Sequence, residues 1–300
     1  MNMSKYQDKQ LYLGVDGGGS KCRAVIFCPE QGIIAEAVSG PANVLRGSAK
    51  AINNIVKATD EALASLSLPA EYKSQLIAGI GLAGLNLESC MIEMQVWSHP
   101  FKQVSFTSDL HIACIGAHSG KDGAVMIIGT GSSALVSNQN KINELGGHGF
   151  PVGDCGSGAW LGLNAIEVTL ECLDGLKPET KLTKSIADFY DVDTAINLAQ
   201  IVSTFVPADF AKLAPLIMEH AKQQDVYALQ LVQTGADYLS RVALKLMEEK
   251  TLPLSLIGGL SPLMANYFDE QVKQLLKPAE NPPEMGAVLF AQQSAAIQTN

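Results

Sequence analysis

The sequence predicts an α/β protein made of two lobes around a central cleft, with a helical insertion in the second lobe. Residues 11–27 contain two runs rich in β-formers on either side of a turn of three glycines, the pattern of an antiparallel hairpin. The same order of strand, glycine turn and strand returns at 123–137. This repeat indicates a duplicated fold, although two unrelated hairpins would give the same pattern. Residues 181–250 show only helical periodicity, which indicates the insertion.

Length and charge limit the classes of partner. The chain has 300 residues, enough for one large domain or two medium ones. Its net charge is −9, from 21 basic and 30 acidic residues, and it has no run of lysine or arginine. This balance argues against nucleic acid or an anionic membrane as the main partner.

The N-terminal segment and the cysteines indicate the cellular compartment of the protein. Segment 1–10 is polar and lacks the apolar centre of a signal peptide, and no apolar run reaches membrane-spanning length. Six cysteines lie far apart without CxxC spacing. That distribution is typical of reduced, buried thiols and supports neither a disulfide framework nor a zinc site. We therefore expect a cytoplasmic protein.

In the first half, three adjacent strands are followed by alternating helices and strands, which predicts a mixed sheet with helical cover. Beyond the hairpin, the expected elements are strand 32–38, helix 48–66, strand 76–82, helix 87–97 and strand 103–107. The final helix, 286–296, begins after a pair of prolines. We expect an N-terminal lobe of 1–116 plus 285–300 and a C-terminal lobe of 117–284.

The second half repeats this organisation and extends it. The expected elements are helix 110–117, strands 123–128 and 133–137, a helix ending near Cys172, and strand 254–257 followed by a helix. Residues 146–162 form an ordered glycine-rich loop before the helix that ends near Cys172. Within 181–250, breaks are expected at Pro207 and near Asp225.

The first glycine turn carries candidate chemistry. Gly17, Gly18 and Gly19 let backbone N–H groups approach a ligand, as in loops that cradle phosphate. Asp16 closes the strand before them, a good position for a carboxylate that holds a divalent cation brought in by a nucleotide. Ser20 offers a hydroxyl to phosphate, while Lys21 either binds phosphate or points to solvent. A plain surface hairpin is the alternative on this stretch alone.

Four glycine motifs, in order, carry a resemblance that covers essentially the whole chain. Residues 15–21 (VDGGGSK) and 128–132 (IGTGS) resemble the two phosphate motifs of the sugar kinase, actin and heat-shock-chaperone superfamily, and 256–260 (LIGGL) resembles its adenosine motif. With 146–154 (GGHGFPVGD), they resemble the N-acetylglucosamine and glucosamine kinase branch of the BadF/BadG/BcrA/BcrD-type ATPase family. The resemblance implies ribonuclease H-like (actin-like ATPase) lobes, ATP with Mg²⁺, and a homodimer.

The resemblance also implies residue roles at the sugar. Asp109 follows a strand and begins a helix, and the matching aspartate in these kinases is the catalytic base. Asn43 and Asp154 match positions that hydrogen-bond sugar hydroxyls, and Gly147 and His148 lie in the same loop as Asp154. Simpler interpretations stay open: Asp109 as a helix cap, Asn43 as a turn former and His148 as a loop filler.

The nucleotide roles follow in the same way. Thr130, Gly131 and Ser132 would contact phosphate, and Gly258 and Gly259 would let adenosine approach the backbone. Lobe closure would exclude water from the reaction.

The reaction implied is transfer of phosphate from ATP to the 6-hydroxyl of N-acetylglucosamine. Free glucosamine is the close alternative, because 39–43, 99–101 and 116–118 also resemble bacterial glucosamine kinases. A further alternative is an activator ATPase of the benzoyl-CoA reductase type, in which cysteines hold an iron–sulfur cluster. Cys155 lies in the matching glycine-rich segment, but no second cysteine stands at cluster spacing.

Overall fold

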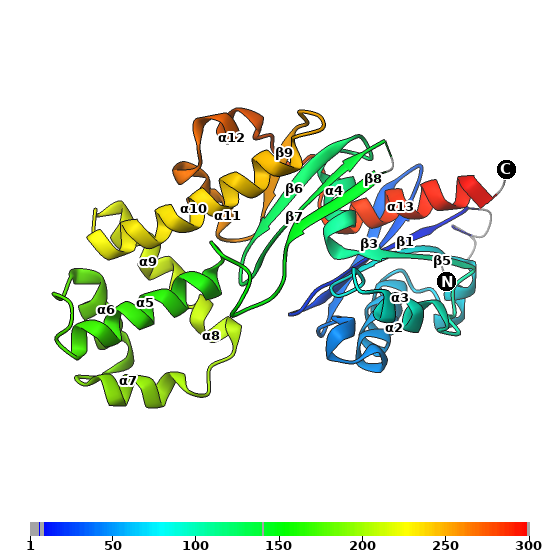
Figure 1. Cartoon of the computed structure of the whole chain (residues 1–300). Helices are drawn as coiled ribbons and strands as arrows, with labels where there is room; N and C mark the ends of the chain where they lie inside the picture. The colour runs from blue at the N-terminus through cyan, green and yellow to red at the C-terminus, as the bar shows by residue number, and fades with distance from the viewer. Residues whose placement is uncertain (1–5, 7–8, 140, 299–300) are drawn as a thin grey trace. The chain divides into compact units, whose positions relative to one another are not determined.

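The structure is a computed structural model that describes residues 6, 9–139 and 141–298. Most of the polar segment 1–10 therefore lies outside the described residues. The chain divides into two compact units (Figure 1). Unit 1 comprises Met1–Gly123 and Pro278–Asn300, and unit 2 comprises Ala124–Lys277.

Unit 1 is built on a mixed sheet whose five strands, in the described part of the chain, follow the order β3-β2-β1-β4-β5. The strands are β1 (Tyr12–Gly17), β2 (Cys22–Cys28), β3 (Gly32–Ser39), β4 (Ile77–Leu82) and β5 (Gln103–Ser108). The pairs β1–β2 and β2–β3 are antiparallel, whereas β1–β4 and β4–β5 are parallel. The predicted hairpin and mixed sheet are thus confirmed.

The helices of unit 1 are α2 (Ser48–Ser65), α3 (Glu88–Gln95), α4 (Asp109–Ala117) and α13 (Pro283–Gln298), with the short 3₁₀ helices η1 (Val44–Arg46) and η2 (Ala70–Gln75). The chain's last helix, α13, packs directly on its first strand. A Cβ at Gly14 would overlap the carbonyl oxygen of Glu284, and one at Gly79 would overlap that of Ala287. Only glycine permits this approach, so the C-terminal segment is part of the first unit's core.

Unit 2 contains a second sheet, of order β8-β7-β6-β9 in the described residues. Its strands are β6 (Gly123–Ile128), β7 (Ser132–Asn138), β8 (Lys141–Gly146) and β9 (Leu254–Ile257). Strand β8 was not predicted, because its sequence is polar and its first half is exposed at the sheet edge. The duplicated pattern was the available signal, since β3 follows the first hairpin as β8 follows the second.

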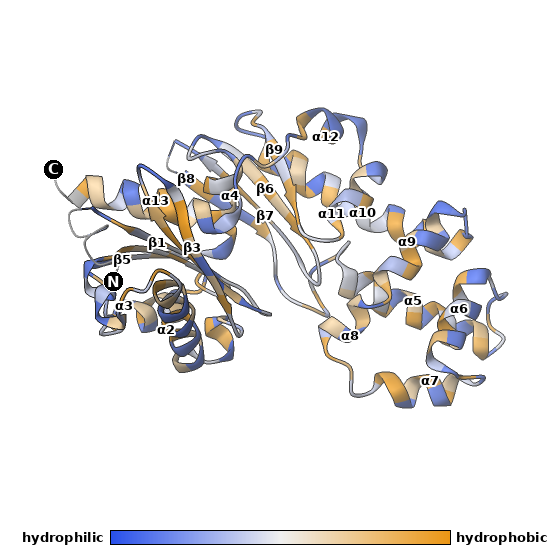
Figure 2. Cartoon of the chain, turned by 180° about the vertical axis from the view of Figure 1, so that it is seen from behind, coloured by the Kyte–Doolittle hydropathy of each residue, from blue (hydrophilic) through white to orange (hydrophobic). Residues whose placement is uncertain are grey.

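The remaining regular elements of unit 2 in the described residues are helices. They are α5 (Gly158–Leu173), α6 (Lys181–Tyr190), α7 (Ala195–Val202), α8 (Pro207–Ala211), α9 (Ala214–Lys222), α10 (Val226–Leu246), α11 (Ser261–Met264), η3 (Ala265–Tyr267) and α12 (Glu270–Leu275). The predicted breaks are confirmed: Pro207 begins α8, and Asp225 caps α10 by accepting from the amide of Tyr227 at 3.1 Å. In Figure 2, α5 is mostly hydrophobic and α10 carries both hydrophobic and hydrophilic residues, and both helices contribute buried side chains to the core of unit 2.

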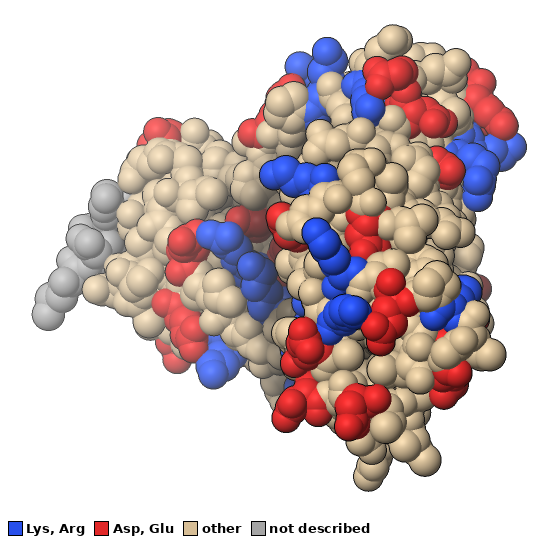
Figure 3. Space-filling view, turned by 90° about the vertical axis from the view of Figure 1, so that its left-hand side faces the viewer, with Lys and Arg blue, Asp and Glu red and all other residues tan. Residues whose placement is uncertain are grey.

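No helix in the described part of the chain is long and apolar enough to cross a membrane. On the face drawn in Figure 3, lysine and arginine side chains are interspersed with aspartate and glutamate. That face therefore presents no broad basic surface of the kind that binds a phosphate backbone.

Candidate active site

The carboxyl ends of three parallel strands bring the predicted residues of unit 1 to one sheet edge. Asp16 on β1 is in register with Gly81 on β4, which is in register with Thr107 on β5. Asp109 follows two residues later, at the start of α4. Ligands commonly bind outside the carboxyl ends of such strands.

Asp16 lies in an electrostatically unfavourable place for a carboxylate. Burial, together with the negative charges of Asp109 and Glu284, raises its pKa to about 7, while Lys21 and Arg23 lower the pKa by smaller amounts. A divalent cation would supply the missing positive charge, so the site fits Mg²⁺ by its electrostatics. In the described residues no group of three or more His, Cys, Asp or Glu could hold a metal. A magnesium ion here would therefore depend on phosphate oxygens for most of its ligands.

Asp109 is the first residue of α4, but Ser108 is the residue that caps the helix. The Ser108 hydroxyl accepts from the amide of His111 at 3.1 Å. The Asp109 carboxylate accepts from the neighbouring amide of Leu110 at 2.9 Å. Helix capping is thus assigned to Ser108, which leaves the position of Asp109 to be explained by another role.

The first glycine turn contains two kinds of glycine. Gly17 is packed, because an added Cβ would overlap Leu82 and lie 2.9 Å from the Cβ of Ala42. Gly19 is exposed, and an added Cβ there would meet no atom within 4 Å. The protein itself gives no steric reason for glycine at 19, so the open space is suited to a ligand. Lys21 is exposed next to this turn, and its carbonyl accepts from the amide of Gly18 at 2.9 Å.

Asn43 is a turn former, and its geometry also leaves a donor for a ligand. Its side-chain oxygen accepts from the amide of Leu45 at 2.9 Å and so caps η1. The same oxygen would lie 3.3 Å from a Cβ at Gly84, in the loop after β4. Because the oxygen is used in the cap, the amide nitrogen of Asn43 is the group suited to a sugar hydroxyl.

In unit 2, the second glycine turn is fastened to the start of α5. The amide of Gly158 donates to the carbonyl of Gly129 at 2.8 Å, and the amide of Ala159 donates to that of Thr130 at 3.1 Å. Thr130 is exposed, whereas Ser132 is buried and its hydroxyl donates to the carbonyl of Cys155 at 3.1 Å. The Ser132 hydroxyl therefore serves the loop's own structure, and the Thr130 hydroxyl is the one open to a ligand.

Asp154 lies against this second turn. It adopts a left-handed conformation, φ 62°, and its carboxylate accepts from the amide of Gly149 at 3.2 Å. A Cβ at Gly131 would lie 2.8 Å from its other oxygen. Partial burial raises the pKa of Asp154. Gly147 and His148 are exposed in the same loop, so the structure places these sequence-predicted residues together within unit 2.

A cavity of about 470 Å³ adjoins the second turn. It is lined by Gly129, Thr130, Gly158, Ala211, Ala214, Pro215, Gly259, Leu260 and Leu263. Gly258, beside it, has φ +106°, a conformation that favours glycine. The sequence pattern identified Thr130 and Gly259 but not the residues from α8, α9 and α11. Nothing local marks an alanine or a proline of a distant helical insertion as part of a binding site.

A model of the BadF/BadG/BcrA/BcrD ATPase family matches residues 13–291, nearly the whole chain. The chain belongs to this family. It is 31% identical over 283 residues to the glucosamine kinase GspK of Vibrio cholerae, covering 93% of this chain and 95% of that protein. It is 25% identical over 297 residues to the N-acetylmuramic acid/N-acetylglucosamine kinase of Clostridium acetobutylicum, covering 93% and 97%.

The family assignment extends to the three-dimensional structure. The crystal structure of a proposed N-acetylglucosamine kinase from Chromobacterium violaceum matches with a TM-score of 0.86 at 28% identity. The match covers 95% of this chain and 99% of that one. The predicted α/β architecture of the actin-like ATPase type, with two sheets, is thereby confirmed.

Proposed function

We propose that this protein is an ATP-dependent kinase of an amino sugar, with N-acetylglucosamine as first substrate and glucosamine as the alternative. One observation carries the proposal: Asp16 and Asp109 stand at one sheet edge beside an open glycine turn, and the charge of Asp109 contributes to the raised pKa of Asp16. The kinase names of full-length relatives support it. Glucosamine keeps its place because the 31% identical relative is a glucosamine kinase.

Asp109 is the residue suited to the proton transfer. The 6-hydroxyl oxygen of the sugar would attack the γ-phosphorus, and the bond from that phosphorus to the β–γ bridging oxygen would break. The hydroxyl proton would pass to the Asp109 carboxylate, and ADP would leave with the bridging oxygen. A positioned carboxylate contributes about 10²- to 10⁴-fold to such a step.

Asp16 would hold the magnesium ion, which supplies charge neutralisation at the phosphates when bound. The backbone amide of Gly19 would bind phosphate in unit 1, beside Gly18, whose own amide is used within the turn, and Thr130 and Gly131 would bind phosphate in unit 2. The cavity beside Thr130 would take the adenosine.

The sugar would be bound by hydrogen-bonding groups of both polarities. The Asn43 amide nitrogen would donate to a sugar hydroxyl, the Asp154 carboxylate would accept from one, and Gly147 and His148 would line the sugar nearby. A homodimer is a further proposal that rests on the family resemblance, and a cytoplasmic location is one that rests on the scattered cysteines.

The test is ADP release from ATP and Mg²⁺ with N-acetylglucosamine, with glucosamine and without sugar. We expect ADP with an amino sugar only, and a kcat at least about 100-fold lower in Asp109→Ala. The matched control is Ser108→Ala, which removes the α4 cap and costs about 1 kcal/mol of stability while keeping kcat within a few-fold. Sugar-independent hydrolysis that persists in Asp109→Ala would contradict the kinase and favour the activator ATPase.

A further inference from the structure

The cavity beside the second glycine turn offers a nucleobase almost no hydrogen-bonding side chain. Of its nine lining residues, only Thr130 has a polar side chain, and the others are glycine, alanine, proline or leucine. Thr130 is the residue assigned above to phosphate. The walls of this cavity can therefore recognise a base by shape and apolar contact, but not by side-chain hydrogen bonds to its edge.

Much of the nearby backbone is also already hydrogen-bonded. The amide of Gly129 donates to the carbonyl of Gly131 at 2.9 Å, and the carbonyl of Gly129 accepts from Gly158. The carbonyl of Thr130 accepts from Ala159, and the amide of Leu260 donates to Ile128 at 3.1 Å. Pro215, at the start of α9, has no amide hydrogen to offer. Main-chain reading of the base edge is correspondingly restricted.

The glycines at the cavity mark where the ligand would lie. An added Cβ at Gly129 or Gly259 would meet no atom within 4 Å, and neither has a positive φ. Gly158 differs, because its Cβ would lie 3.1 Å from the carbonyl oxygen of Gly129 and 3.2 Å from the Cβ of Ala211. Gly158 is needed for packing, whereas the two open glycines keep space free.

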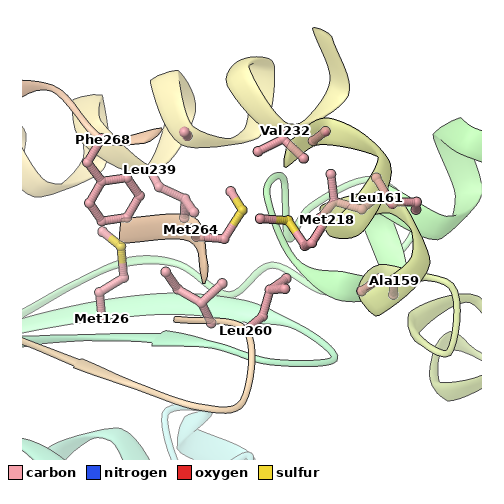
Figure 4. Close-up of a cluster of buried hydrophobic side chains, with 14 of the residues drawn as sticks. Met126, Ala159, Leu161, Met218, Val232, Leu239, Leu260, Met264 and Phe268 are labelled. Carbon is pink, nitrogen blue, oxygen red and sulfur yellow. The ribbon is translucent and has the colours of Figure 1, made fainter. Parts of the chain in front are cut away.

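The apolar wall is held in place by the core behind it. Leu260 is 7% exposed and its side chain lies in the buried cluster with Met126 and Met264 (Figure 4). Leu263, on α11, is 44% exposed and faces the cavity as the accessible apolar side chain. A flat purine ring could lie against Leu263 whatever substituents its edge carries.

We propose that this cavity binds the purine without selecting among purine bases, so that the protein uses ATP, ITP and GTP with similar efficiency. The inference rests on the proposed nucleotide role of the cavity. A site that hydrogen-bonds a substituent rejects an analogue lacking it by about 10⁴- to 10⁵-fold, whereas an apolar pocket discriminates by about 10- to 200-fold at most. ITP is the sharpest probe, because it differs from ATP only at the 6-position of the ring and in the proton on N1.

The test has a kinetic arm and a binding arm. We expect the values of kcat/KM for ATP, ITP and GTP, with one sugar, to agree within about 200-fold. We also expect the dissociation constants of ADP, IDP and GDP from calorimetry to agree within the same limit. A spread above about 200-fold in the binding arm overturns the inference. If the diphosphates bind alike but no sugar is phosphorylated, the inference stands and the kinase proposal fails.

A matched pair of variants tests where the base lies. Leu263→Ala should weaken the binding of ADP, IDP and GDP by the same factor, about three- to tenfold. The control is Ile196→Ala. Ile196 is an aliphatic residue of α7 that is 76% exposed and lies outside the cavity, so its substitution should leave all three dissociation constants unchanged. Unequal losses in Leu263→Ala would show that the wall reads the base edge, and no loss at all would place the base elsewhere. Either result overturns the inference.

Discussion

The Nε atom of Arg23 lies 3.2 Å from the Glu284 carboxylate. Arg23 is on β2, directly opposite Asp16 near the end of β1. The Glu284 side chain is only 6% exposed. The other end of the guanidinium donates to Glu36 on β3 at 2.7 Å. Arg23 therefore connects β3, through Glu36, with the last helix, α13, through Glu284, at the point where the sheet carries Asp16.

Removing Arg23 should leave a buried carboxylate without its counter-ion. We expect Arg23→Met to lower the free energy of unfolding by about 2–4 kcal/mol. The double variant Arg23→Met/Glu284→Leu should recover most of the loss, because it removes both charges from the interior. Urea unfolding of the two single variants and the double variant completes the cycle. Strictly additive effects would contradict the ion pair.

Asp16 should make the protein less stable as the pH rises. Its folded pKa is about 7, above the ordinary value of about 3.9 in an unfolded chain. The folded state therefore binds the extra proton between these values, and stability falls as the pH rises through that window. A difference of about three between the folded and unfolded pKa values of Asp16 corresponds to at most about 4 kcal/mol in the free energy of unfolding.

Asp16→Asn removes this penalty, so we expect it to be more stable than wild type at pH 8 and no more stable at pH 4. Thermal unfolding in EDTA measures the difference, and Mg²⁺ with ADP should raise the Tm of wild type by more than that of Asp16→Asn. The control is Asp237→Asn, at an exposed carboxylate of α10. Parallel pH profiles for Asp16→Asn and wild type would refute the assignment.

Local patterns single out Asp16 and Asp109 as candidates, whereas other features of the two sites depend on long-range contacts. Asp16 closes a strand before a glycine turn, and Asp109 stands between a strand and a helix, so each has a signal within a few residues. Glu284 has no such local signal, because the strand that packs against its segment, at Gly14, lies at the other end of the chain. Its link to Arg23 exists only after the sheet has formed.

The same division applies to the unit 2 site. The glycine motifs at 129–131 and 258–259 can be recognised in the sequence. Ala211 and Leu263 join them only through the folding of distant segments. The internal use of the Ser132 hydroxyl was equally invisible, because its acceptor belongs to Cys155 in another segment.

The two kinds of glycine in the first turn should respond differently to substitution. Gly19→Ala meets no atom within 4 Å, so we expect wild-type stability with ATP affinity at least about tenfold lower, since the methyl group occupies ligand space. Gly17→Ala overlaps Leu82 and crowds Ala42, which costs about 1–3 kcal/mol of stability. Urea unfolding and the KM for ATP separate the two. Equal loss of stability in both variants would argue against an open phosphate loop.

Substitution of Asp154 should weaken the binding of the sugar and leave the binding of the nucleotide unchanged. Asn tolerates the left-handed φ of 62° at this position, and its side-chain oxygen can still accept from Gly149, so Asp154→Asn removes the charge while keeping the loop. We expect the KM for the sugar to rise about ten- to 100-fold, with the KM for ATP unchanged. Burial raises the pKa of Asp154, so the wild-type KM for the sugar should rise as the pH falls, whereas that of Asp154→Asn should stay flat. A higher KM for ATP with an unchanged KM for the sugar would move Asp154 from the sugar to the nucleotide.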